Sequence, residues 1–340
     1  MILIDAIFIN NGGGKVLLDY LVETLEQTDL KIFYLFDDRI VNRYEIKKEN
    51  VFIYQNSSLR LRYKFYKKYS SQFSKIFVLG NIPPPIKVKK AEVYTYFHNP
   101  MYLRVPNDFS ITEKIKYILK VCIINKNKSN TNYWLLQSNT LKEQFIEKFG
   151  EKEKVKTLPF YPSLESSNCN VKRIKNTFFY VSNAQANKNH IKLIEAFCNS
   201  YDITKKGKLI LTVSDKFPIV LKSIDKGKEN GYPIENIGFV DRETLTKKYL
   251  ESEYVIFPSL AESFGLGLIE GVELGCKVIS ADLPYTYAVC NPSLVFNPFE
   301  VESISRAINT ASQNDLNNSS LNVQNQIEDL ITLLNGSKKN

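Results

Sequence analysis

The stretch "AESFGLGLIEGVELG", residues 261–275, contains the pattern from which the fold and the function are predicted. It sets two glutamates, Glu262 and Glu270, on either side of a Phe-Gly-Leu-Gly turn. Gly265 and Gly267 allow a tight turn and a close approach of the backbone. The apolar run after them predicts a helix whose free N–H groups and positive dipole end suit an anion. The stretch therefore predicts a phosphate site between two carboxylates, although carboxylates are also common at ordinary helix starts.

Short apolar segments alternate with helix-like segments twice along the chain, which predicts parallel strands covered by helices on both faces. Two such sets predict an α/β protein with two Rossmann-like, doubly wound parallel-sheet domains. Strands are expected at 2–9, 31–36, 51–55, 75–80, 92–98, 133–138 and 155–160, and then at 177–182, 208–214, 237–240, 254–259, 277–281 and 294–298. Helices are expected at 15–27, 111–124, 140–148, 189–200, 217–228, 243–252 and 266–274.

The polar stretch 166–176 is the expected linker between the domains. The sequence thus predicts an N-terminal domain over 1–168 and a C-terminal domain over 169–310. A helical segment and tail over 311–340 follow, with packing back on the N-terminal domain as one option.

Composition narrows the class of protein. Of 340 residues, 44% are hydrophobic, which is enough for a sizeable core. The sequence starts without a signal-peptide pattern, and no apolar run approaches the ~20 residues of a membrane-spanning helix. Five cysteines are scattered and form no CxxC pair, so a disulfide framework or a zinc cluster is not expected. These features predict a cytoplasmic protein.

The net charge of +9 is unevenly distributed. Residues 1–170 carry 26 Lys and Arg against 17 Asp and Glu, a difference of +9, whereas residues 171–340 carry 19 of each. The densest stretch is "LRLRYKFYKKY", residues 59–69, whose cations are Arg60, Arg62, Lys64, Lys67 and Lys68. Such a segment attracts anionic lipid, polyphosphate or nucleic acid, or it is a solvated helix face. We expect it to contact an anionic membrane surface and no nucleic acid, because no nucleic-acid-binding motif accompanies it.

The region around the glycine turn closely resembles the signature of the retaining GT-B glycosyltransferases of family 4. That signature is carried here by "PSLAESFGLGLIEGVELGCKVISAD" (258–282), and "FFYVSNAQANKNHIKLIEAF" (178–197) and "IGFVDRETLTKKYLESEYVIFPS" (237–259) agree in order and spacing. The resemblance is specific over about 176–300 and general over the N-terminal half. It implies a GT-B fold, two Rossmann-like domains facing a cleft, with a nucleotide sugar held by the C-terminal domain.

The resemblance also implies roles for single residues. Glu270 would hold the donor ribose, Glu262 the transferred sugar, and Lys188 the diphosphate. Ser182 occupies the position where the family usually has an arginine, so the diphosphate has one cation fewer. The implied donor-binding set is Gly13, Gly14, Ser182, Lys188, Phe239, Val240, Glu262, Ser263, Phe264, Gly265, Leu266 and Glu270.

In the N-terminal half, "FINNGGGKVLLDYL" (8–21) predicts a strand, a glycine-rich loop and a helix. It matches neither a Walker A loop nor GxGxxG. His98 ends the predicted strand 92–98 and matches the family's active-site histidine; a hydrogen-bonded histidine at a strand end is the alternative. The implied catalytic residues are His98, Lys188 and Glu262. His190 is expected to start a helix. Asp37 and Asp38 lack the Asp-x-Asp spacing for a metal-bound diphosphate, so neither a metal nor a cofactor is expected.

The sequence therefore predicts a hexosyltransferase-type enzyme at the inner face of the plasma membrane. It would transfer a sugar, with retention, from a nucleoside diphosphate sugar to a hydroxyl of a glycan or lipid-linked glycan, in surface polysaccharide or lipopolysaccharide synthesis. A sugar-nucleotide epimerase or phosphorylase of the same fold is the alternative, and a basic nucleic-acid-binding protein is a third possibility.

Overall fold

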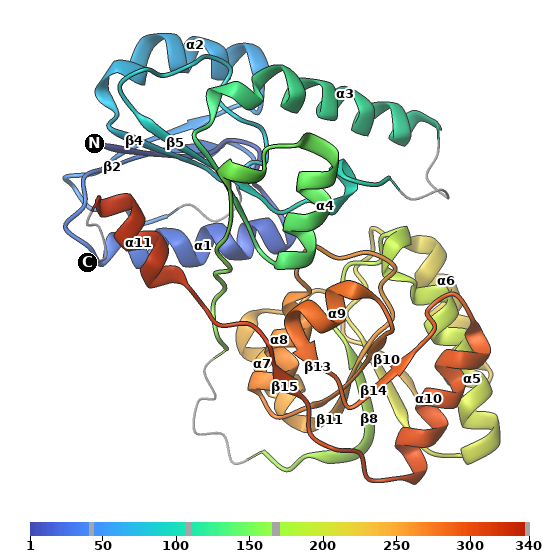
Figure 1. Ribbon diagram of the computed structural model, residues 1–340. Helices are drawn as coiled ribbons and strands as arrows, with labels where there is room; N and C mark the ends of the chain where they lie inside the picture. The colour runs from blue at the N-terminus through green and yellow to red at the C-terminus, as the bar shows by residue number, and fades with distance from the viewer. Residues whose placement is uncertain (41–43, 106–110, 165–170, 337–340) are drawn as a thin grey trace. The chain divides into compact units, whose positions relative to one another are not determined.

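The computed structural model describes residues 1–40, 44–105, 111–164 and 171–336 (Figure 1). The chain forms two compact units: unit 1 is Met1–Pro162 with Gln324–Asn340, and unit 2 is Ser163–Val323. The expected boundary at 168/169 lies outside the described residues. Residues 311–323, expected with the C-terminal tail, lie instead in unit 2, because helix α10 (Val301–Gln313) runs without a break through position 310.

Within the described residues, unit 1 contains a seven-stranded parallel sheet in the order β3-β2-β1-β4-β5-β6-β7. The strands are β1 (Ile2–Ala6), β2 (Ile32–Asp37), β3 (Val51–Gln55), β4 (Lys75–Val78), β5 (Glu92–Phe97), β6 (Tyr133–Leu136) and β7 (Val155–Thr157). The central strands β1 and β2 are buried along their whole length, which explains why they are apolar except at Asp5 and Asp37.

Helices cover both faces of this sheet (Figure 1). Helix α1 (Gly12–Glu26) and the C-terminal helix α11 (Ile327–Asn335) lie on one face, and α2 (Leu59–Tyr69), α3 (Ile111–Asn127) and α4 (Asn139–Phe149) lie on the other. The entry into α11 is fixed to unit 1, where the Gln326 N–H donates to the Pro159 carbonyl at 2.8 Å. Further along α11, Lys75 Nζ donates to the Leu333 carbonyl.

Helix α2 corrects one part of the prediction for residues 59–69. Arg62 was expected among the cations that face a partner surface, but its side chain is 1% exposed. It forms an ion pair with Asp5 of β1 at 2.7 Å and donates to the carbonyls of Ile82 and Pro83, both at 2.9 Å. The helical period explains the difference, because Arg62 shares the inward stripe of α2 with Phe65 and Tyr66.

Over the same described ranges, unit 2 contains a six-stranded parallel sheet in the order β10-β9-β8-β11-β12-β14. The strands are β8 (Ile174–Tyr180), β9 (Lys208–Leu211), β10 (Ile234–Asn236), β11 (Ser252–Phe257), β12 (Lys277–Ala281) and β14 (Leu294–Phe296). The helices are α5 (His190–Thr204), α6 (Pro218–Glu229), α7 (Arg242–Glu251), α8 (Leu266–Glu273), α9 (Pro284–Val289) and α10. A short antiparallel pair, β13 (Cys290–Asn291) with β15 (Ser320–Leu321), was not expected from the sequence.

Both sheets therefore confirm the predicted architecture of two doubly wound α/β domains, with the first strand of each unit next to its fourth. The predicted strand 237–240 is wrong, since the strand is β10 and these residues follow it. The strand order reverses between β1 and β4 and between β8 and β11. In open α/β sheets, ligands generally bind at such reversals, at the carboxyl ends of the strands. Among the described residues, no helix is long and apolar enough to cross a membrane.

Candidate functional site

The glycine turn of unit 2 follows β11 and leads into α8. Gly265 occupies the N-cap position with φ of +77°, which a side chain would strain. At Gly267, an added Cβ would lie 3.1 Å from the ring of Phe257. Because Gly265 has no side chain, the first N–H groups of α8 receive no side-chain cap. The positive end of an eight-residue helix is thus available beside the carboxyl end of β11, as the sequence predicted.

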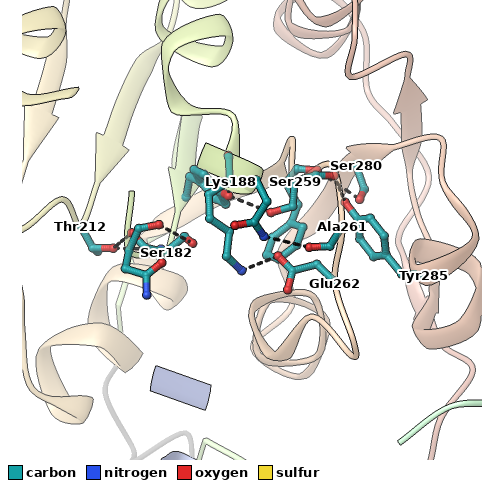
Figure 2. A network of polar contacts seen from close by, with 12 residues as sticks. Ser182, Lys188, Thr212, Ser259, Ala261, Glu262, Ser280 and Tyr285 are labelled. Atoms are coloured by element: carbon teal, nitrogen blue, oxygen red, sulfur yellow. Dashed lines mark hydrogen bonds and ion pairs between the residues drawn. The ribbon is translucent and has the colours of Figure 1, made fainter. Parts of the chain in front are cut away.

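Lys188 and Glu262 form the charged centre of this region. Their side chains meet at 2.5 Å, with exposed fractions of 18% and 11% (Figure 2). Lys188 ends the short 3-10 helix Ala186–Lys188 after β8, and Glu262 follows β11. These two strands are neighbours at the reversal of the strand order, so the sheet topology brings together residues 74 positions apart. Each side chain retains hydrogen-bonding capacity, since an ammonium has three donors and a carboxylate accepts from several.

Asparagines on either side of Lys188 hold the two loops together. The Asn187 amide donates to the Ala261 carbonyl at 3.1 Å, and the Asn187 carbonyl accepts from Leu260 N–H at 2.8 Å. Asn189 has φ of +59° and donates to the Pro258 carbonyl at 3.2 Å. These contacts fix the backbone on both sides of the Lys188–Glu262 pair. The sequence analysis did not assign either asparagine, although a left-handed Asn before a helix is a known signal.

Two buried tyrosines, Tyr180 and Tyr285, hold the backbone next to the Lys188–Glu262 pair. The sequence analysis did not predict them. The hydroxyl of Tyr180, at the end of β8, donates to the Lys188 carbonyl and lies 2.9 Å from Ser259 Oγ. Tyr285 donates to the Ser259 carbonyl at 2.7 Å (Figure 2). Burial first, and then the charge of Glu262, raises the pKa of both phenols, so both stay neutral. For Tyr180, the available signal was a phenol at the end of an otherwise apolar strand, whereas Tyr285 lies on α9.

Glu270 lies in a separate buried cluster on α8. Its side chain is 8% exposed and accepts a hydrogen bond from the Tyr249 hydroxyl at 2.9 Å. Arg242 Nη1 is 3.9 Å away, at the limit of an ion pair. Burial raises the pKa of Glu270 to about 7, against the lowering effect of Tyr249 and Arg242. A buried carboxylate with so few partners can accept more hydrogen bonds than the protein gives it.

Other residues of the predicted donor set lie in nearby loops. Ser182 follows β8, and its N–H donates to Thr212 Oγ1 at 3.1 Å (Figure 2). Ser263 is half-buried between Glu262 and the buried Phe264, just before Gly265 and Leu266. Phe239 is 92% exposed in the loop after β10, and Val240 follows it half-buried. Phe239 therefore contributes nothing to the core of the sheet.

The corresponding edge of unit 1 contains the three consecutive glycines and His98. The sequence analysis expected the glycines in a loop before the helix. Helix α1 instead begins at Gly12, so Gly13 and Gly14 lie in its first turn. A Cβ on Gly14 would lie 3.1 Å from His98 Cε1, so the imidazole packs against this turn. His98 Nε2 donates to the Leu79 carbonyl at 2.9 Å, and His98 N–H donates to Asn81 Oδ1 at 2.7 Å.

Burial lowers the pKa of His98 to about 4, so its imidazole is neutral near pH 7. His190 starts α5 as expected, and burial lowers its pKa to about 3. Within the described ranges, no group of three or more His, Cys, Asp or Glu side chains is arranged to hold a metal ion.

The chain is similar to a family model, to a curated protein and to solved structures. Residues 163–328 match the family model described as Glycosyl transferases group 1. A segment of 98 residues is 28% identical to the O-antigen chain mannosyltransferase B of Escherichia coli; it covers 28% of this chain and 26% of that relative. The chain thus matches about a quarter of the length of this curated protein.

Two solved structures are similar over nearly the whole chain. Sucrose-phosphate synthase from Thermosynechococcus elongatus has a TM-score of 0.70 at 15% identity, covering 92% of both chains. Anabaena Alr3699/HepE, in complex with UDP and glucose, has a TM-score of 0.68 at 14% identity, covering 92% of this chain and 89% of that one. Residues 163–328 thus match the glycosyl transferases group 1 family model, and the two Rossmann-like units of the chain have the GT-B fold.

Proposed function

We propose that this protein is a retaining glycosyltransferase that transfers a hexose from a nucleoside diphosphate sugar to a hydroxyl of a glycan or lipid-linked glycan. The observation that carries the proposal is the Lys188–Glu262 pair beside the uncapped N terminus of α8. The family match and the UDP and glucose bound by the Anabaena protein support a nucleotide-sugar donor. The mannosyltransferase relative supports a role in bacterial surface polysaccharide or lipopolysaccharide synthesis. The proposed location of this synthesis is the cytoplasm.

In this proposal the nucleotide sugar replaces the ion pair between Lys188 and Glu262. The diphosphate takes Lys188 from Glu262 and lies against the first N–H groups of α8. Glu262 then accepts hydrogen bonds from hydroxyls of the transferred sugar. Glu270 accepts from the ribose diol, which gives its carboxylate the partners that Tyr249 alone does not supply. With Ser182 in place of the family's arginine, Lys188 carries most of the cationic charge of this loop.

The chemical demand is stabilisation of the departing diphosphate and of an oxocarbenium-like centre. Preorganised charge from Lys188 and α8 meets the first part of that demand, and we propose that no metal or cofactor takes part. With its pKa lowered to about 4, His98 is a weak base. We therefore assign it to orienting the sugar, while the leaving phosphate takes the acceptor proton.

The test is incubation with UDP-, GDP-, dTDP- and ADP-sugars, with and without oligosaccharide acceptors. We expect acceptor-dependent release of the nucleoside diphosphate and a product with the donor's anomeric configuration by NMR. Thermal shifts with the free nucleotides identify the base. Lys188→Met should lose donor binding, whereas the matched variant Lys192→Met, an exposed lysine of α5, should keep it. Added EDTA should leave the rate unchanged.

The alternatives give other outcomes in the same assay. An epimerase changes the donor sugar without an acceptor, and a phosphorylase releases a sugar phosphate only when inorganic phosphate is present. A nucleic-acid-binding protein shifts RNA or DNA in a gel and releases no diphosphate. Any of these results would replace the proposed transfer.

A further inference from the structure

Tyr249 is the one close hydrogen-bond donor that the described residues give to the side chain of Glu270. Its hydroxyl, on α7, donates to Glu270 Oε2, on α8, at 2.9 Å. The described contact of the other oxygen, Oε1, is Arg242 Nη1 at 3.9 Å. Tyr249 thus occupies one oxygen of the carboxylate and leaves the second oxygen available to a ligand.

The fold fixes both the ring and the backbone of Tyr249. The residue is fully buried, and its ring packs edge-on against Phe179 with the ring centres 5.0 Å apart. Its carbonyl accepts from Cys276 Sγ at 3.1 Å and from Arg173 Nη1 at 3.4 Å. Burial, and then the charge of Glu270, raises the pKa of the phenol well above its usual value, so the hydroxyl keeps its proton and donates.

Two glycines of α8 permit the close packing around this contact. At Gly267, an added Cβ would lie 3.4 Å from the Tyr249 hydroxyl, so the phenol lies directly against the first turn of the helix. At Gly271, the residue after Glu270, an added Cβ would lie 2.7 Å from Val255 Cγ2, so α8 packs on β11 without space for a side chain. Backbone packing therefore sets the position of Glu270, and Tyr249 sets the direction of its carboxylate.

We propose that Tyr249 is a positioning residue that holds the Glu270 carboxylate for the vicinal diol of a ribonucleotide. This inference rests on the proposed function, and it narrows the donor to ribonucleoside diphosphate sugars. Glu270 lies about 6 Å along α8 from Leu266, so a ribose joined to a diphosphate at the N terminus of the helix can reach it. A 2′-deoxyribonucleotide lacks the diol and leaves a buried acceptor without a donor, which a site of this kind penalises.

The same contact favours the ionised form of Glu270, in which its oxygens accept hydrogen bonds best. Burial raises the pKa of Glu270 to about 7, Tyr249 and then Arg242 lower it, and Glu273 of the same helix raises it. Loss of the Tyr249 hydroxyl therefore raises this pKa further, and more of the carboxylate is protonated at pH 7. A preference for the ribonucleotide should then develop only at higher pH.

The experiment is calorimetry with UDP, GDP and ADP, each beside its 2′-deoxy form, from about pH 6 to pH 9. The ratio of the two affinities at each pH cancels the ionisation of the diphosphate, which both forms share. Above pH 7, wild type should prefer one ribonucleotide by about tenfold to a hundredfold, the effect of one hydrogen bond to a charged group. In Tyr249→Phe the preference should fall to about threefold or less at pH 7 and increase again towards pH 9.

The matched control is Tyr254→Phe, which removes another buried hydroxyl of unit 2, a donor to the Ala311 carbonyl at 2.9 Å. It should keep the wild-type preference. Glu270→Ala should lose the preference, and Tyr249→Phe added to it should change nothing more, because the tyrosine acts through the carboxylate. Thermal melting of every variant shows that each one is folded.

Four results would overturn this inference and leave the proposed sugar transfer in place. They are equal binding of both forms by wild type, binding of dTDP alone, a full preference in Tyr249→Phe at every pH, and an equal loss in Tyr254→Phe. A further loss of affinity when Tyr249→Phe is added to Glu270→Ala would show a purely structural role and overturn it as well. Wild type that binds no nucleoside diphosphate would contradict the proposed function together with the inference.

Discussion

In the part of the chain that the structure describes, each unit buries a carboxylate near the reversal of its strand order, Asp5 in unit 1 and Glu270 in unit 2, and the two have different surroundings. In unit 1, Asp5 is 1% exposed and is held by Arg62 at 2.7 Å and by the Tyr66 hydroxyl at 2.7 Å. The remaining guanidinium donors of Arg62 reach the carbonyls of Ile82 and Pro83. Charge and hydrogen-bonding capacity are satisfied within the fold.

In unit 2, the Glu270 side chain is 8% exposed, and its described partners are one close donor, the Tyr249 hydroxyl, and a distant Arg242. Burial raises its pKa to about 7, which means that the charged form is costly where it lies. The difference teaches that the fold itself compensates the charge of Asp5 in unit 1, whereas the charge of Glu270 in unit 2 is held at a cost. Such a cost is typical of residues whose partner is a ligand.

Breaking the Arg62–Asp5 ion pair in unit 1 should give the largest effect, a loss of free energy of unfolding. Arg62→Ala leaves Asp5 buried without its counter-charge, and removal of one partner of a buried ion pair costs about 3–5 kcal/mol. Urea unfolding of the purified protein measures this loss. Arg60→Ala, on the exposed side of the same helix, should change the free energy of unfolding by less than about 0.5 kcal/mol. Similar losses in both variants would remove the structural role of the pair.

Removing the carboxylate of unit 2 should instead affect binding. Glu270→Ala deprives the ribose of a charged acceptor, a contact worth roughly 1.5–3 kcal/mol, so nucleoside diphosphate affinity should fall about tenfold to a hundredfold. Calorimetry with the preferred nucleotide measures it. Glu273→Ala, on the same helix, should bind normally. Unchanged affinity in folded Glu270→Ala protein would exclude Glu270 from the donor site.

Glu262 should act differently from Glu270, because it pairs with Lys188 on the sugar side of the glycine turn. Glu262→Ala should lower turnover about tenfold, by loss of contacts that strengthen in the transition state. The affinity for the nucleoside diphosphate should stay within about twofold, since Lys188 remains available. Steady-state kinetics together with calorimetry separate the two effects. An equal loss of diphosphate affinity in both glutamate variants would contradict this division of roles.

The smallest expected effect is a pH-dependent change in melting temperature when Glu270 is replaced by Gln. Glu270 has a folded pKa of about 7 against 4.5 for the ordinary side chain, so its stabilising protonated form is lost as pH rises from about 4.5 through 7. Glu270→Gln, which cannot ionise, should therefore melt close to wild type at low pH and a few degrees higher above neutrality. Melting curves across this range test it, with Glu243→Gln, at an exposed carboxylate of α7, as the control. A constant difference at every pH would show that ionisation of Glu270 does not affect stability.

Much of the fold could be predicted because its signals are local. An apolar run with β-branched and aromatic residues predicts a buried parallel strand wherever it occurs, and the strands β1 to β12 lie at or beside the predicted segments, except that β10 precedes 237–240. The turn at Gly265 was predictable for the same reason, since its conformation depends on that residue alone. The start of α1 at Gly12 was not, because glycines usually end a helical pattern.

By itself, the sequence determined the two sets of alternating elements, the glycine turn and the chemical character of Lys188, Glu262 and Glu270. Only the tertiary structure decided which charges are satisfied. Arg62 belongs to the densest basic stretch, yet it meets Asp5 across 57 residues, and Tyr249 meets Glu270 across 21. Isoleucines of α3 that a helical pattern could have placed in a core lie instead on the surface. The physical reason is that desolvation and pairing depend on neighbours from other strands and helices, which no local pattern of residues specifies.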